Sequence, residues 1–404
     1  MSEVAPAAGT PRPGPALAAL FAAAFVMGSA ELLVVGVIDL IAADLAVAVS
    51  TAGAAVTAYA LGIAIGGPIL TALTIRAGRR PVLAWALAGY VVATAAPLFT
   101  SSAVLFLTAR FAAGALHGLF IGVAFAVAGA LVPPERTGRA IGIVLGGISV
   151  STALGVPLGT LVGQGMGWRA GFVGVSVLGL GALFALLRVV PQVRTAGGGS
   201  SAAVQARHAF APRVLAVLGT GLLLLGGQYA VLTYITPFLQ ERTGVSSGAV
   251  SAFLLAYGVA TAVGVFAGGW AADRSATRTL LLGNAALVVA LGLLHLVAAI
   301  PVLVAVVLVA WGVVGIGLVP SLQYRVLDLA GPGRDLAATL PASALNAGIA
   351  LGALAGGWTL DTYGAGGPVI TGLVVTALAL PAAWATATLR APRAATPLTE
   401  GVAS

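Results

Sequence analysis

The amino-acid sequence predicts an all-α membrane protein with twelve transmembrane helices in two six-helix, pseudo-symmetric halves. Of its 404 residues, 60% are hydrophobic and only 7% are charged, and the mean hydropathy is +1.09. A soluble domain typically carries about 25% charged residues, so most of this apolar surface needs lipid as its solvent. Two further observations complete the prediction: twelve apolar segments of spanning length, and a repeat at an offset of 197 residues.

Twelve segments are long and apolar enough to span a membrane, which takes about 20 residues each. The first ends in Gly36-Val-Ile-Asp39, which offers no small-x-small cleavage site, so we expect a retained span and not a removed signal peptide. In chain order the predicted spans are 17–38, 51–75, 81–100, 104–132, 140–163, 170–190, 214–239, 248–272, 279–300, 302–322, 336–360 and 367–389.

All nineteen basic residues are arginine, and their positions predict the orientation of the chain. With the N-terminus inside, sixteen arginines fall in inside segments, whereas the outside loops hold only Arg169 and Arg242, and Arg110 lies within the fourth span. This distribution satisfies the positive-inside rule. It supports the count of twelve spans and predicts that both termini are cytoplasmic.

The longest connection lies near the midpoint of the chain and contains Gly197-Gly-Gly-Ser-Ser201, which is typical of a flexible linker. The predicted organisation is a disordered cytoplasmic N-terminus at 1–16, an N-terminal six-helix half at 17–190, a cytoplasmic linker at 191–212, a C-terminal six-helix half at 213–389 and a cytoplasmic tail at 390–404.

The repeat matches both spans and loops between the two halves. The matched positions are Gly155 with Gly352, Gly159 with Gly356, Glu31 with Gln228, and, with a slip of one residue, the turn 76–80 with 274–278. Glycine-rich helices also match by chance, but here loop and span positions match together. Two parallel repeats around a cleft are typical of a transporter that rocks around a midplane site.

Several short stretches, in order and in the expected spans, carry a family resemblance. They are Gly28-Ser-Ala-Glu31-Leu-Leu-Val-Val-Gly36, Ala58-Tyr-Ala-Leu-Gly62, Arg110 with Gly114, Gly118 and Gly122, Pro133-Pro-Glu-Arg-Thr-Gly-Arg139, Gly155-Val-Pro157-Leu-Gly159 with Gly167-Trp168-Arg169, and Tyr234-Ile-Thr-Pro237-Phe-Leu. At these residues the chain resembles the major facilitator superfamily. Within it, the chain is similar to the twelve-span drug:proton antiporters, and among these to bacterial chloramphenicol-resistance and arabinose (sugar) efflux permeases.

The resemblance covers roughly residues 17–390 and implies the major facilitator fold with proton-coupled export. It also implies that Gly155, Pro157 and Gly159 form the antiporter motif of the fifth span. One departure concerns the loop motif after the second span, where the family's aspartate is replaced by Ile75. The second copy keeps it as Asp273, so a gating role for the first-half aspartate does not carry over.

Glu31 is the only acid well inside a predicted span. A carboxylate at membrane depth costs roughly 2.5–3.5 kcal/mol on insertion scales, so it usually faces protein or a water-filled cavity. Removal from water favours the protonated form, which couples proton binding to conformation. We expect Glu31 to couple protons and to touch substrate. The alternative is a shifted first span with Glu31 near the outer rim, since Asp39 and Asp44 follow closely.

Arg110 is the only basic residue inside a span, and we expect it to be the neighbour of Glu31 in proton coupling. It would face the interior of the N-terminal half and pair with a carboxylate or with backbone carbonyls. The alternative is an arginine that snorkels to the outer interface. His117 lies seven residues further on and suits a proton relay, although a single histidine on an apolar face is more often packed.

Two groups of residues are candidates for gating. Pro157 between Gly155 and Gly159 predicts a bend with close helix packing, which would close the cleft and prevent leakage; plain glycine packing is the alternative. The cytoplasmic loop motifs predict a conformation-dependent ion-pair latch, although solvated helix ends are the alternative reading. Their residues are Arg79, Arg80, Asp273, Arg274 and Arg278.

The seventh span is unusually polar, and aromatic and amide groups on an apolar cleft suit an amphipathic small molecule. The predicted substrate cavity contains Glu31, Tyr59, Gln228, Tyr229, Tyr234 and Asn346. We further expect Glu31 and Gln228 to face each other across it.

These observations predict a proton-driven exporter of a small amphipathic compound, for example a phenicol, in a bacterial inner membrane, working as a monomer. The alternative is a sugar or metabolite efflux permease of the same fold. A channel suits the repeat and its one central acid less well. A membrane enzyme usually needs clustered acids or histidines, which this chain lacks.

There is no cysteine, no lysine for a Walker motif and no basic face for nucleic acid. We therefore expect no metal or cofactor, and lipid, protons and substrate as partners.

Overall fold

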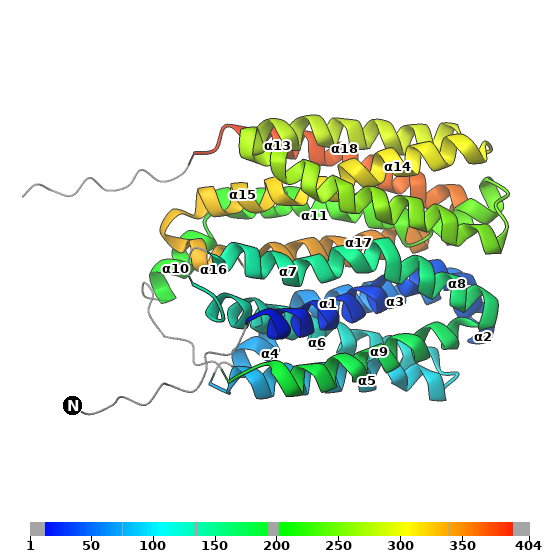
Figure 1. Cartoon of the computed structure of the whole chain (residues 1–404). Helices are drawn as coiled ribbons and strands as arrows, with labels where there is room; N and C mark the ends of the chain where they lie inside the picture. The colour runs from blue at the N-terminus through cyan, green and yellow to red at the C-terminus, as the bar shows by residue number, and fades with distance from the viewer. Residues whose placement is uncertain (1–12, 75, 134–135, 193–201, 339, 391–404) are drawn as a thin grey trace, which may run out of the picture.

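The computed structural model describes residues 13–74, 76–133, 136–192, 202–338 and 340–390. Within these ranges the chain forms a bundle of long helices that run side by side (Figure 1). Most of the predicted N-terminal segment 1–16, part of the linker 191–212 and nearly all of the tail 390–404 lie outside the described residues. The described part of the linker contains a short helix, α10 (Ala202–Ala209), which packs against η6 (Gly331–Gly333) and α16 (Arg334–Ala337).

The N-terminal half contains six spans, several of them built from two or three consecutive helical segments. In chain order its elements are α1 (Pro13–Gly36), α2 (Ile38–Asp44), α3 (Val49–Leu61), η1 (Gly62–Gly66), α4 (Gly67–Leu73), α5 (Arg79–Ala95), η2 (Ala96–Phe99), α6 (Ala103–Ala130), α7 (Thr137–Val150), η4 (Ser151–Gly155), α8 (Val156–Met166) and α9 (Trp168–Val189).

The C-terminal half follows the same plan after α10. Its elements are α11 (Pro212–Leu232), α12 (Ile235–Pro237), η5 (Phe238–Arg242), α13 (Ser247–Leu296), α14 (Pro301–Gly317), α15 (Val319–Ala330), η6, α16, α17 (Leu340–Tyr363), η7 (Gly364–Gly366) and α18 (Gly367–Ala387). Proline stands in the first turn of α11, α14 and α18, where its missing N–H leaves no hydrogen bond unmade.

The described residues form ten helical runs that are long and apolar enough to cross a membrane. Two runs are too long for one crossing: Ser247–Leu296 has 50 residues, and Leu340–Ala387 has 48. The first changes direction at Ser275, whose backbone is not helical, and the second turns at Gly364, where φ is +70°. Each is therefore two spans. The prediction of twelve helices in two halves is confirmed.

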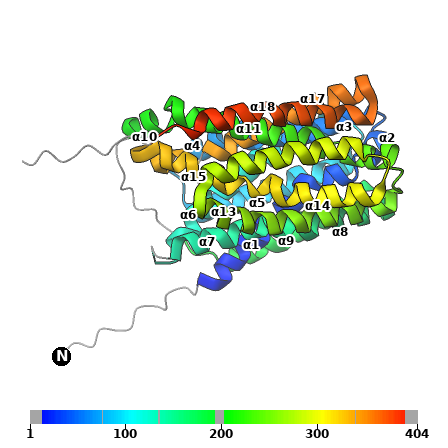
Figure 2. The same cartoon turned by 90° about the horizontal axis from the view of Figure 1, so that it is seen from above.

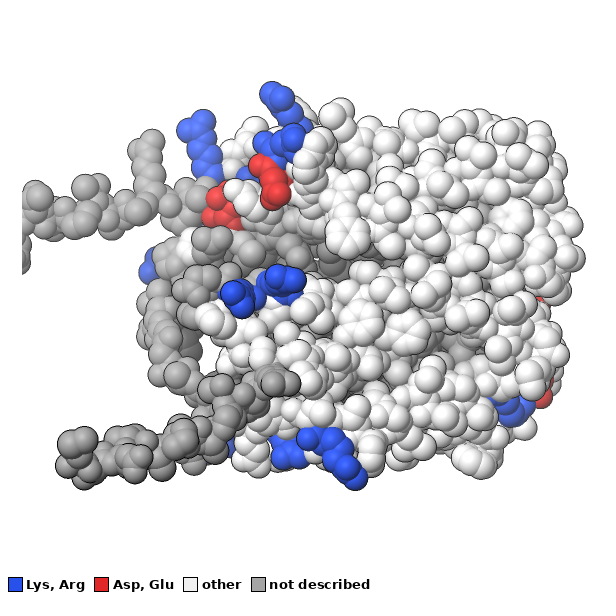
Figure 3. All heavy atoms as spheres, in the orientation of Figure 1, with Lys and Arg blue, Asp and Glu red and all other residues white. Residues whose placement is uncertain are grey.

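Arginine side chains gather toward one end of the bundle in Figure 3, a broad band free of charge covers the middle of the face, and a smaller blue and red group lies at the opposite end. Both described ends of the chain lie at this arginine-rich end, as Figures 1 and 2 show. We call it the inner end, and the opposite end the outer end. This arrangement matches the predicted arginine distribution, while the orientation in a membrane remains a prediction.

The two halves contact each other mainly through the middle and outer parts of their spans. On one side α3 and the π-helical turn η1 pack on α17, and the Thr57 hydroxyl donates to the Ala350 carbonyl over 3.2 Å. On the other side α8 and the π-helical turn η4 pack on α13. Among the described residues, the inner segments α4 and α7 have few or no such contacts across the halves. The halves are therefore closed at the outer end and parted at the inner end.

Candidate transport site

A cavity of about 150 Å³ lies between the two halves, at the level of Glu31. The N-terminal half contributes Gly28, Glu31, Leu32, Ile148, Ser149 and Thr152, and the C-terminal half contributes Tyr229, Leu232, Tyr257, Thr261, Ala262, Val265 and Ile316. A narrower crevice continues beside it, lined by Glu31, Leu32, Val56, Tyr59, Ala60, Tyr229 and Ile349. Glu31 is the one charged residue among these described lining residues, and it borders both spaces.

The cavity lies on the inner side of the closest crossing between the halves. There Gly258 of α13 meets the backbone of Thr152 in η4, so closely that a methyl group on Gly258 would overlap the Thr152 carbonyl. The lining residues Ser149 and Thr261 follow one turn further toward the inner end of their helices. The cavity is thus sealed on its outer side and faces the inner end, which in the predicted orientation is an inward-facing arrangement.

Three helices of the N-terminal half converge behind Glu31 of α1. From α6 come Arg110 and His117, and from α3 and α5 come Tyr59 and Tyr90. The Nδ1 atom of His117 lies 3.7 Å from the Glu31 carboxylate and 2.8 Å from the Tyr59 hydroxyl. The Tyr90 hydroxyl donates to the Met27 carbonyl over 3.1 Å. Because the Glu31 side chain is 20% exposed and that of His117 is 5% exposed, the carboxylate faces the cavity and the histidine lies behind it.

Arg110 is buried and directs its guanidinium to the backbone of α1. It donates to the carbonyls of Ala30 and Glu31, each over 2.9 Å, and its Cζ atom lies 4.2 Å from the centre of the Tyr59 ring. Of the two partners expected for Arg110, the structure thus shows carbonyls and not the Glu31 carboxylate. The charge of Glu31 is left without an ion pair to arginine and remains available to the cavity.

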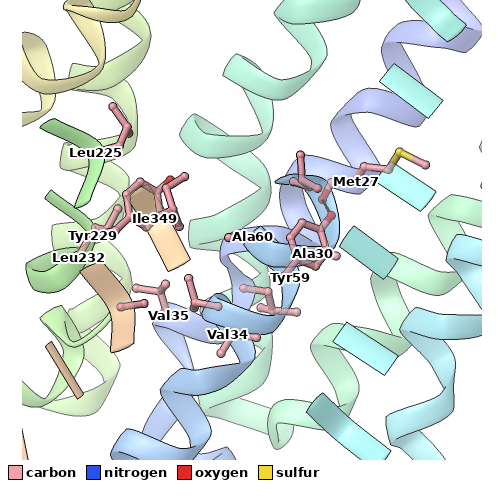
Figure 4. Packing of buried hydrophobic residues seen from close by; sticks show 14 of the residues in the cluster. Met27, Ala30, Val34, Val35, Tyr59, Ala60, Leu225, Tyr229, Leu232 and Ile349 are labelled. Carbon is pink, nitrogen blue, oxygen red and sulfur yellow. Dashed lines mark hydrogen bonds between the residues drawn. The ribbon is translucent and has the colours of Figure 1, made fainter. Parts of the chain in front are cut away.

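Tyr229 lies in the predicted place, whereas its neighbour Gln228 does not. Figure 4 shows Tyr229 and Ile349 from the C-terminal half across from Ala30, Val34 and Tyr59 of the N-terminal half. The amide oxygen of Gln228 accepts from the indole of Trp311 over 3.1 Å, and its nitrogen donates to the Leu224 carbonyl over 3.2 Å. Gln228 is therefore turned into the C-terminal half, and Glu31 and Gln228 do not face each other.

Two other predicted cavity residues also lie outside both spaces. Tyr234 is buried at the outer end, where its hydroxyl donates to the Ala353 carbonyl over 3.0 Å. Asn346 donates to the Ala342 carbonyl within α17 over 2.9 Å. Sequence reasoning missed Tyr257 and Thr152, which line the cavity. Tyr257 and Gly264 are seven residues apart on α13, so they lie on the same face of that helix. This spacing was the signal in the sequence that could have pointed to Tyr257.

The antiporter-motif residues hold the fifth span against α1. A methyl group on Gly155 would overlap the hydroxyl of Ser29, and one on Gly159 would press on Leu33. Pro157 stands in the first turn of α8, directly after the π-helical turn η4. The motif therefore shapes the segment that meets α13 at the outer seal.

The cytoplasmic loop residues lie at the inner ends of their helices. Arg79 and Arg80 begin α5, and Arg80 donates to the Leu187 carbonyl. Arg274 stacks on the ring of Trp270, and the backbone N–H of Arg278 donates to Ser275. Within the described residues Asp273 forms no ion pair in this inward-facing arrangement, and no cluster of three acidic, histidine or cysteine side chains could hold a metal.

Two six-helix halves around a central cavity that opens at one end define a membrane transporter. A family model described as Major Facilitator Superfamily matches residues 20–340 and 218–403. The chain is 34% identical over 371 residues to the MFS-type transporter YtbD of Bacillus subtilis, covering 89% of this chain and 94% of that protein. The chain belongs to the major facilitator superfamily, as its resemblance predicted.

Two further comparisons support the same assignment. The chloramphenicol resistance protein of Streptomyces lividans is 32% identical over 358 residues, covering 88% of this chain and 91% of that protein. A crystal structure of a bacterial homolog of the human lysosomal transporter Spinster, inward-facing and unoccupied, has a TM-score of 0.73 at 16% identity. It covers 94% of this chain and 98% of that one, and it shows the fold.

Proposed function

We propose that this transporter exports a small amphipathic compound from the bacterial cytoplasm in exchange for protons, with Glu31 as the shared binding group. The observation that carries the proposal is the position of Glu31, the one charged side chain on both spaces between the halves among the described residues. A carboxylate there can bind either a proton or the substrate. Binding of one therefore disfavours binding of the other.

The environment of Glu31 supports this exchange. Arg110 donates its hydrogen bonds to backbone carbonyls of α1 and α3, so it supplies nearby positive charge without capping the carboxylate. His117 lies within 3.7 Å and is a titratable side chain that could accept or return a proton. Both features allow the Glu31 carboxylate to exchange a proton for substrate, whereas a tight ion pair with arginine would hold the carboxylate ionised.

The cavity lining favours an amphipathic compound over a sugar. Aliphatic side chains and the two phenol rings of Tyr229 and Tyr257 form most of it, and Ser149, Thr152 and Thr261 supply hydroxyl groups. Such a lining suits a ring with a few polar substituents, and a sugar would require many more hydroxyl and amide partners. Since a relative is named a chloramphenicol resistance protein, a phenicol is the first compound to test.

In this scheme the proton gradient is the only energy source and no cofactor takes part. The protein would act as a monomer in the inner membrane, with both termini in the cytoplasm. Loading occurs in the inward-facing arrangement described above.

The experiment uses purified protein in liposomes and a panel of phenicols and other amphipathic drugs. Substrate-driven proton release is followed with a trapped pH dye for the parent, Glu31→Gln and Asp361→Asn. Asp361 is an exposed acid on α17 outside both spaces, so its variant is the matched control. We expect Glu31→Gln to lose proton release at least about tenfold, and Asp361→Asn to keep it. Full transport with intact proton release in Glu31→Gln would refute the proposal.

A further inference from the structure

The outer closure is built from two broken helices at equivalent places in the repeat. The first span breaks at Val37 (φ −130°, ψ 21°), and the seventh breaks at Tyr234 (φ −113°, ψ 24°). These breaks lie 197 residues apart, which is the offset of the repeat. Beyond them α2 and α12 turn toward each other and are in contact. The breaks therefore bring the outer ends of the two halves together.

A polar cluster joins the two halves at this place. The Asp39 carboxylate accepts a hydrogen bond from Gln240 of the C-terminal half over 3.2 Å and one from Gln164 of the N-terminal half over 3.3 Å. Gln240 also donates to Ser247 over 3.2 Å, and the Thr236 hydroxyl donates to the Val35 carbonyl over 2.7 Å. Of these groups, only Asp39 is charged.

Asp39 stands at the start of α2 and is partly shielded from water. Asp39 is half-buried, so water can only partly replace its hydrogen bonds when they break. Hydrogen bonds to an ionised acceptor are roughly twice as strong as those between neutral groups.

We propose that Asp39 is a gating residue, and that its hydrogen bond to Gln240 holds the outer end closed while the cavity faces inward. The bond joins one half to the other, so it must break whenever the outer end opens. It is present in one of the two alternating states and absent in the other, and it therefore biases their populations. This inference requires only that the two halves alternate. It does not depend on proton coupling or on the identity of the substrate.

The test measures the distance between the outer ends by pulsed spin-label spectroscopy. The chain contains no cysteine, so Met166→Cys on α8 and Thr362→Cys on α17 can be labelled without background. Both positions are exposed and belong to opposite halves. Asp39→Ala removes the acceptor, and Gln240→Glu places a second carboxylate opposite Asp39. Each variant should shift the population of molecules about tenfold toward longer distances between the labels.

Two further variants separate gating from general damage. Asp44→Ala removes a carboxylate of the same α2 helix whose partner, Arg169 at 2.5 Å, lies in the same half; it should leave the distances as in the parent. Asp39→Asn combined with Gln240→Glu reverses the donor and acceptor and should restore the closed population. The proposal is overturned if Asp39→Ala and Asp44→Ala give the same distances, or if the reversed pair stays as open as Gln240→Glu alone. Gel-filtration profiles check that each variant folds.

Discussion

At the scale of single residues, Glu31 and Arg110 have separate tasks, although the sequence alone predicts that they act together in proton coupling. Glu31 presents its carboxylate to the cavity, while Arg110 holds the α1 backbone through the carbonyls of Ala30 and Glu31. Arg110 is thereby a positioning residue. Its planar guanidinium stacks on Tyr59 and donates in two directions, which lysine could not reproduce.

The two roles of Tyr59 can be separated by substitution. Tyr59→Phe removes the hydroxyl that bonds His117 but keeps the ring under Arg110, so we expect a loss of about 1 kcal/mol of stability. Tyr59→Leu also removes the cation–π contact and should cost about 1–2 kcal/mol more. Unfolding in mild detergent measures both. An equal loss in the two variants would show that the ring does not support Arg110.

Gln228 and Tyr229 are adjacent in sequence but should respond differently to substitution. Gln228→Leu leaves the buried indole N–H of Trp311 without its acceptor, so we expect stability to fall by about 1–3 kcal/mol. Tyr229→Phe alters the cavity wall and should change substrate preference with little loss of stability. Thermal unfolding together with a drug panel checks both expectations. A substrate effect confined to Gln228→Leu would contradict this assignment.

At the scale of elements, the π-helical turns mark where the halves meet. Both η1 in the second span and η4 in the fifth span pack against the opposite half, on α17 and α13 respectively. A π-helical turn inserts an extra residue per turn, which locally bends and widens a helix. These turns lie where the two halves meet, and neither Pro157 nor the glycine spacing reveals them from sequence.

The crossing of η4 and α13 predicts the effect of one methyl group. Gly258→Ala would force α13 away from the Thr152 carbonyl, so we expect the outer seal to weaken and transport to fall at least about tenfold, with a stability loss of about 1–3 kcal/mol. Gly269→Ala on the same helix meets nothing within 4 Å and serves as the control. Transport assays and unfolding compare the two variants. Equal activity would show that the crossing tolerates displacement.

At the scale of the whole molecule, the structure corresponds to one state of the proposed alternating-access cycle. The halves are closed at the outer end and parted at the inner end, and the cavity lies between the two. The proposed export requires the reverse arrangement as well, in which α4 and α7 would approach the C-terminal half. The loop residue Asp273 lies where such an approach would occur, after the inner end of the eighth span.

The direction in which the cavity opens can be tested with a single cysteine. Ser149→Cys on the cavity wall should react with a membrane-impermeant maleimide at least about tenfold faster in inside-out vesicles than in intact cells, because solvent reaches it from the inner end. Transported substrate should slow this reaction. Ser176→Cys, buried in α9 outside the cavity, should react slowly in both preparations. Faster labelling from the outside would contradict the inward-facing assignment.

Much of the fold could be predicted from the sequence, because span length, arginine position and the repeat each report on the membrane directly. The same signals predicted Glu31 and Tyr229 in the substrate cavity, and both side chains border the cavity in the structure. They could not distinguish Tyr229 from Gln228, because hydropathy reports where a residue lies along a span and not how the helix is rotated. Asp39 escaped notice for a related reason: its partner Gln240 is 201 residues away and is reached only through two helix breaks.

By itself, the sequence determined that this chain spans a membrane twelve times in two related halves and that one carboxylate lies deep within them. Only the tertiary structure decided which side chains face the cavity, which carbonyls Arg110 binds and which end is open. The physical reason is that nearly every face of these helices is apolar. Lipid, helix neighbour and cavity therefore look alike in sequence, and only close packing between small residues selects among them.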